Sequence, residues 1–164
     1  MSEDIQRIVS QAGEALADAV EAALPAWVRR SVEHLLIAWG GWADPDLLAR
    51  ADVAGERAGR DVGARVRGLV SGDPDAQTTT PLSILRQAVS YPAEILQAAG
   101  VPEVERDEFA QRRFPGDHYG LSPASWADID PGLTDVGLAW GAAVALAHRH
   151  RHRPGTGTDP KAAG

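Results

Sequence analysis

The segment from Phe114 to Gly132 is the part of this chain that is densest in side chains able to do chemistry. Its carboxylates, imidazole, phenol and hydroxyls can act as general acids and bases, as nucleophiles or as metal ligands. The spacing of these groups matches no G-x-S-x-G elbow, no H-E-x-x-H pair, no EF-hand loop and no phosphate-binding glycine motif. The candidate ligand-binding residues are Asp117, His118, Tyr119, Trp126 and Asp128 in this segment, and Trp42 and Asp44 at an earlier corner of the chain.

The same segment also has a structural interpretation. Ser122 and Asp130 each precede a proline, and such pairs are typical of the capping residue and first residue of a helix. The apolar side chains that can fix the segment to the core are Leu121, Trp126 and Ile129. The side chains left without a structural role are those of Asp117, His118, Tyr119 and Asp128. The pattern therefore favours a structural connection, with a polar site as the alternative.

The amino-acid composition excludes several classes of function. The chain has 164 residues and no cysteine, which rules out disulfides, thiolate metal sites and a cysteine nucleophile. Its net charge of −7 disfavours DNA binding, because the phosphate backbone repels an acidic protein. The longest apolar run, residues 136–147, is shorter than the about 20 residues that a membrane-spanning helix needs. Residues 1–24 lack the pattern of a signal peptide, so we expect a cytoplasmic protein. We also expect no cofactor, no bound metal, no DNA binding and no membrane association.

Hydrophobic periodicity of 3.6 residues predicts helices along most of the chain. An apolar stripe runs from Ile5 to Leu24, and Pro25 then interrupts it. The stripe resumes at Trp27 and continues to Trp39, which predicts two helices or one kinked helix with both tryptophans in the core. Glycines 40 and 41 are a typical stop signal.

Four pairs of a capping residue and a proline are the strongest sign of an all-helical protein. The pairs are Asp44-Pro45, Thr80-Pro81, Ser122-Pro123 and Asp130-Pro131. We therefore predict an all-α fold with one domain of six to eight helices over residues 1–153. Residues 1–39 could be an appended helical arm, and residues 154–164 have the composition of a disordered tail.

The last predicted helix, from about residue 131 to 150, is apolar on every face over residues 136–147. This pattern predicts a central, buried carboxy-terminal helix that includes Trp140. Two ridges of small residues also indicate close approach of helix backbones. The first ridge is Ala51, Gly55, Gly59 and Gly63, and the second is Gly137, Gly141 and Ala145. We expect these two ridges to pack near each other.

Three further patterns indicate little about function. Residues 94–114 have the outline of a helix-turn-helix, but the acids of residues 103–108 would face DNA and repel it. Residues 148–153 alternate histidine with arginine, and His148 and His152 have the spacing of two helical metal ligands. The arginines disfavour a metal, so we expect a solvated helix end, with weak contact to RNA or an acidic partner left open. Residues 42–55 resemble residues 126–137, and we attribute this likeness to chance rather than to an internal duplication of the sequence.

The sequence therefore leaves two interpretations of function. The first is a non-enzymatic protein-interaction module that associates with itself, as a homodimer, or with a protein partner. The second is a small enzyme or ligand-binding protein whose polar site lies where the 114–132 segment meets the corner at residues 39–46. The residue pattern identifies no substrate.

Overall fold

All regular structure in the computed structural model, which describes residues 2–73 and 79–152, is helical. The elements are α1 (Glu3–Gly40), α2 (Pro45–Val70), α3 (Pro81–Arg86), α4 (Ser90–Ala98), α5 (Glu108–Arg113) and α6 (Leu133–Arg151), with 3-10 turns η2 (Gln87–Val89) and η3 (Trp126–Asp128). The predicted all-helical class is confirmed, in a single compact fold. The predicted tail, residues 154–164, lies outside the described residues.

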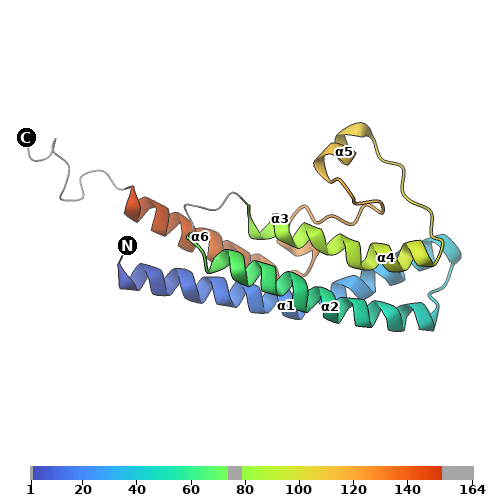
Figure 1. Cartoon of the computed structure of the whole chain (residues 1–164), viewed down its shortest axis with the longest axis horizontal. Coiled ribbons are helices and arrows are strands. Elements are labelled where there is room, and N and C mark those ends of the chain that lie inside the picture. Colours follow the sequence, from blue (N-terminus) through green and yellow to red (C-terminus); the bar gives the residue numbers. More distant parts are fainter. Residues whose placement is uncertain (1, 74–78, 153–164) are drawn as a thin grey trace, which may run out of the picture.

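A long hairpin of α1 and α2 is the base on which the other elements pack (Figure 1). Helix α6 lies antiparallel to α1 along its amino-terminal half. The segment α3–η2–α4 runs alongside α2, and α4 also packs on α1. Residues 99–132, which include α5 and η3, form the long connection from α4 to α6, and Figure 1 shows α5 projecting beyond the helical layers.

The hairpin is held together at Pro25, which lies inside α1 without ending it. Proline has no N–H, so the carbonyl of Glu21 loses its helical donor. The backbone of α2 covers this place: a Cβ atom on Gly55 would lie 2.8 Å from Pro25 O, and one on Gly59 would lie 2.8 Å from Glu21 O. The close approach predicted for the ridge on α2 is thus present, but its partner is α1. The expected pairing with the ridge on α6 was wrong. The indole of Trp126 covers Gly137, and a Cβ atom on Gly141 would meet no atom of the described residues within 4 Å.

The core consists of two apolar clusters, and α1 contributes to both. The larger cluster centres on Leu16, Val20, Leu24 and Val28 of α1, with residues of α2, α3, η2 and α6. The smaller cluster contains Val32 and Leu36 of α1, Ala51 of α2, Leu96 of α4, and Val101 and Tyr119 of the long connection. Helix α1 therefore runs through both clusters and packs on α2, α4 and α6. The stripe position of Trp39 was misleading, because this side chain is 53% exposed at the hairpin end, while Trp27 and Trp140 are buried.

Helix α6 is a surface helix, which corrects the expectation of a central, buried one. Its inner face, formed by Leu133, Gly137, Trp140, Ala143 and Ala147, packs on the core. The opposite face is open, and Leu138 is 64% exposed there. The remaining residues of the open face are mostly alanine and glycine, which have little apolar area to hide from water. Apolar character on every face therefore did not require burial on every face.

The capping signals predicted helix starts correctly at two of four places. The Asp44 side chain accepts a hydrogen bond from Asp46 N at the start of α2, and Thr80 accepts one from Ser83 N at the start of α3. No helix begins at Pro123, and Asp130 caps only a turn before α6. The second helix of the helix-turn-helix outline begins only at Glu108, since residues 101–107 have no regular secondary structure and Asp107 caps α5.

Candidate functional site

Asp117 is a buried carboxylate that organises the 114–132 segment. Its two oxygens accept hydrogen bonds from the backbone N–H groups of Leu121, at 2.8 Å, and Ser122, at 2.7 Å. The guanidinium of Arg106 lies 3.4 Å away, and the side chain of Asp117 is only 2% exposed. Burial alone raises the pKa of Asp117, but these hydrogen bonds and the arginine outweigh it and place the pKa below its usual value. Asp117 is thus an ionised structural group whose oxygens are already occupied.

Tyr119 and His118 lie beside Asp117 but have different surroundings. The Tyr119 hydroxyl donates a hydrogen bond to Val101 O, at 3.0 Å, inside the smaller core cluster. Burial raises the pKa of Tyr119. The side chain of His118 is 49% exposed, with its Nδ1 atom 3.7 Å from a carboxylate oxygen of Glu103. Tyr119 therefore anchors the segment, and His118 remains open to water.

Asp128, Trp126 and Asp44 also have local partners, whereas Trp42 is exposed. Asp128 accepts hydrogen bonds from Ala124 N, at 2.7 Å, and Ser125 N, at 3.0 Å. The indole of Trp126 lies on Gly137, where it occupies the space of a side chain. Asp44 caps α2, and Trp42 is 64% exposed at the hairpin end.

The 114–132 segment and the corner at residues 39–46 each contribute to the smaller core cluster. Tyr119 shares the smaller core cluster with Leu36, and Ala43 and Leu47 pack against this cluster. The structure thus brings the two regions together, while their carboxylates are bound to nearby backbone groups. Because each carboxylate is held by its own neighbouring backbone groups, these aspartates do not form a catalytic pair.

A cluster of arginines around Phe114 was missed in the sequence. The guanidinium carbons lie close to the ring centroid, at 5.3 Å for Arg86, 5.9 Å for Arg106 and 5.2 Å for Arg113. A cavity of about 410 Å³ adjoins the ring between the α3–η2–α4 segment and residues 113–122. Arg113 precedes Phe114 directly, but Arg86 is distant along the chain, and no local spacing signals that it joins them.

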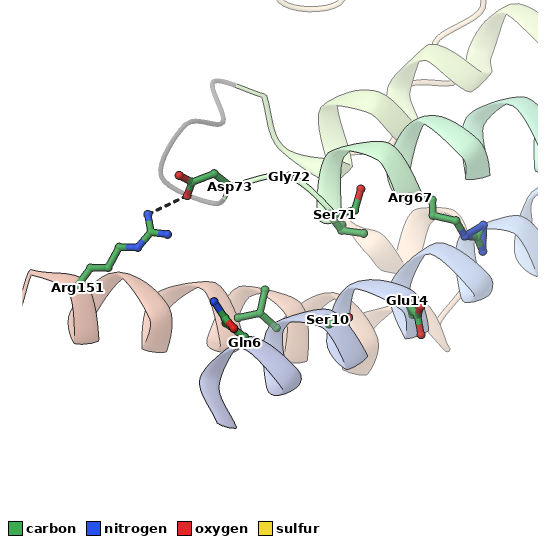
Figure 2. A pocket seen from close by; sticks show the side chains of 10 residues that line it. Gln6, Ser10, Glu14, Arg67, Ser71, Gly72, Asp73 and Arg151 are labelled. Atoms are coloured by element: carbon green, nitrogen blue, oxygen red, sulfur yellow. Dashed lines mark hydrogen bonds and ion pairs between the residues drawn. The ribbon is translucent and has the colours of Figure 1, made fainter. Parts of the chain in front are cut away.

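A second cavity, of about 430 Å³, lies where the ends of α1, α2 and α6 meet (Figure 2). Three of its four charged side chains, those of Arg67, Asp73 and Arg151, form ion pairs. Arg151 forms a hydrogen bond to Asp73 at 2.8 Å, and Arg67 pairs with Asp18 and Glu21 of α1. The charges here are balanced within the fold, and the ion pairs fix the ends of the helices to one another.

Neither a metal centre nor a spanning segment is found in the two described ranges. No group of three histidine or acidic side chains there is placed to hold a metal, although the rings of His148 and His152 lie 4.5 Å apart. None of the described helices has the length and hydropathy to cross a bilayer. Comparison with protein-family models, curated proteins and solved structures finds no match to this chain.

Proposed function

We propose that this chain is a non-enzymatic interaction module that pairs with a second copy of itself through the open face of α6. Five positions on this face alternate at intervals of three and four residues, which is the spacing of a seam along one side of a helix. They are Asp135, Leu138, Ala142, Ala145 and Arg149, named here the outer seam, and all five are exposed. This exposed apolar seam with opposite charges at its two ends is the observation that carries the proposal.

The outer seam is complementary to itself. Asp135 precedes Ala142 by seven residues, and Arg149 follows it by seven. When two copies of α6 pack antiparallel and cross at Ala142, Asp135 of each copy lies opposite Arg149 of the other. Leu138 and the half-buried Leu146 are placed in the same way, four residues before and after Ala142. Such a two-fold arrangement uses one surface twice and closes after two chains.

The charges at the ends of the seam are free to pair across such an interface. Neither Asp135 nor Arg149 forms an ion pair within residues 2–73 and 79–152. Acid near the start of a helix and base near its end also suit the helix dipole, so these charges do not oppose folding of α6.

The size of the seam sets the expected strength of association. Fourteen residues of helix separate its charged ends, which corresponds to about 21 Å. Alanine and glycine let two helices approach closely but bury little area. The interface therefore belongs to the small class below about 1,200 Å², whose complexes are weak and transient. We expect a dissociation constant on the order of micromolar.

The test is sedimentation of charge variants over a range of protein concentrations. The wild-type chain should change from monomer to dimer as its concentration passes through the micromolar range. Arg149→Asp should remain monomeric, because two carboxylates then face each other at each end of the seam. The double variant Asp135→Arg/Arg149→Asp should recover dimerisation. Arg60→Asp, at an exposed position of α2, is the control and should dimerise like the wild type.

Two results would contradict the proposal in different ways. A wild-type chain that stays monomeric at every concentration rules out self-association. A dimer that Arg149→Asp leaves intact rules out the outer seam and points to another exposed apolar surface, such as the hairpin end with Trp39 and Trp42.

A further inference from the structure

The cavity beside Phe114 lies on elements that the outer seam does not use. Arg86 and Ser83 of α3 and Ser90 of α4 line one wall. Arg113, Phe114 and Ser122 line the other. All these residues lie in the described range 79–152, and the volume of about 410 Å³ is within the ~300–1,000 Å³ typical of small-molecule sites.

The charge of this cavity is opposite to that of the chain. No acidic side chain is among the residues that line it, although the chain as a whole carries a net charge of −7. Arg106 is neutralised by Asp117. Arg86 and Arg113, in contrast, form no ion pair with any carboxylate of the described residues. Two guanidinium charges are therefore left uncompensated at one place.

The contacts of these arginines fix them and leave donors available. Arg86 donates a hydrogen bond from Nε to Pro123 O at 2.9 Å, so its two terminal nitrogens remain for another acceptor. Both guanidiniums lie near the Phe114 ring, and a cation–π contact leaves the N–H groups at the edge of the guanidinium free. The serine hydroxyls around them are already engaged: Ser90 donates to Gln87 O, Ser83 is hydrogen-bonded to Thr80, and Ser122 to Asp117. The two guanidiniums are therefore the donors that remain.

We infer that this cavity binds a small molecule through a phosphate group. A phosphate monoester carries about −1.5 to −2 charges at pH 7, which matches two guanidiniums better than the single charge of a carboxylate. Its three terminal oxygens can accept hydrogen bonds from both arginines. The Phe114 ring offers an apolar surface for the organic part of the same molecule. This inference is independent of self-association, because the outer seam lies on α6.

Binding of phenyl phosphate, followed by calorimetry and by amide NMR signals of Phe114, Gly116 and Ser122, tests the inference. Arg113→Gln removes one cation from an exposed side chain and should lower the affinity about tenfold or more. Arg112→Gln is the matched control: Arg112 is the preceding residue of α5, is also exposed and does not line the cavity. The control should change the affinity less than about twofold.

Two simpler probes separate the parts of the ligand. Inorganic phosphate should bind at the same residues but more weakly, because it makes no contact with Phe114. Benzoate, which has the ring and a carboxylate, should bind at least about tenfold more weakly than phenyl phosphate. Equal binding of benzoate would overturn the assignment to phosphate. Absence of saturable binding up to about 10 mM, or equal losses in Arg112→Gln and Arg113→Gln, would overturn the site itself.

Discussion

Replacing Gly55 by alanine tests whether the hairpin depends on contact between the α1 and α2 backbones. An added Cβ atom would lie 2.8 Å from both Cα and O of Pro25, which are backbone atoms that cannot rotate away. Gly68 lies in the same helix, and an added Cβ atom there meets nothing within 4 Å. The two substitutions change the same chemistry in the same helix and differ in the space around it.

The expected changes in the free energy of unfolding have opposite signs. Alanine stabilises a helix interior by about 0.5–1 kcal/mol relative to glycine, so Gly68→Ala should stabilise the fold by up to this amount. Gly55→Ala gains the same term but adds an overpacking cost of about 1–3 kcal/mol. These ranges give a net destabilisation of up to about 2.5 kcal/mol, and contact with backbone atoms that cannot rotate away places it toward the upper end. For a chain of this size, 1 kcal/mol corresponds to about 2–4 °C in Tm.

Thermal and urea unfolding, followed by circular dichroism at one fixed protein concentration, measures both variants. A fixed concentration is needed because self-association would make Tm depend on it. The reasoning fails if Gly55→Ala is as stable as the wild type, or if both substitutions shift Tm in the same direction.

Two further substitutions test the 114–132 segment. Asp117→Asn should lower the free energy of unfolding at pH 7 by about 3 kcal/mol, because it removes the partner of the Arg106 charge. The pKa of Asp117 is depressed in the fold, so the wild-type advantage exists above the ordinary pKa of 3.8 and is lost as the pH falls through the folded pKa. Urea unfolding of the wild type and of Asp117→Asn at pH 7 and at a pH below 3.8 checks this. A difference in free energy of unfolding that is the same at the two pH values would contradict it. Gly137→Ala should displace Trp126 and cost about 1–3 kcal/mol, seen as a change in tryptophan fluorescence together with a lower urea midpoint; unchanged fluorescence would argue against the packing.

Local signals predicted much of this fold because they act within a few residues. The pairs Asp44-Pro45 and Thr80-Pro81 begin helices, and Gly41 ends α1 with a φ of 83°. The pair Ser122-Pro123 has the same composition but begins none. The N–H group of Ser122 is bound by the carboxylate of Asp117, five residues earlier, and this competing partner is not visible in the pair itself.

Features that depend on distant parts of the chain were not predictable from the sequence. Pro25 was expected to interrupt a helix, and no local pattern shows that α2 covers the exposed carbonyl. The apolar α6 could be a buried helix or a surface helix with an open apolar face, and periodicity does not distinguish these. The predicted site residues were chosen for their chemistry. The arginines around Phe114 include Arg86 of α3, which comes next to Arg106 and Arg113 only in the folded chain.

The placement of α6 has a consequence for how the chain folds during synthesis. The α1–α2 hairpin is made of neighbouring segments, so it can form early, while the ribosome is still adding residues. The face of α1 that packs with Trp140 and Ala147 must wait for a partner encoded far downstream. Arg30 and Ile129, whose hydrogen bond lies at the start of this contact, are 99 positions apart. A nascent chain therefore exposes this apolar face of α1 until α6 leaves the exit tunnel. A nascent chain stalled before residue 133 would be an intermediate whose apolar face on α1 is open to chaperone binding.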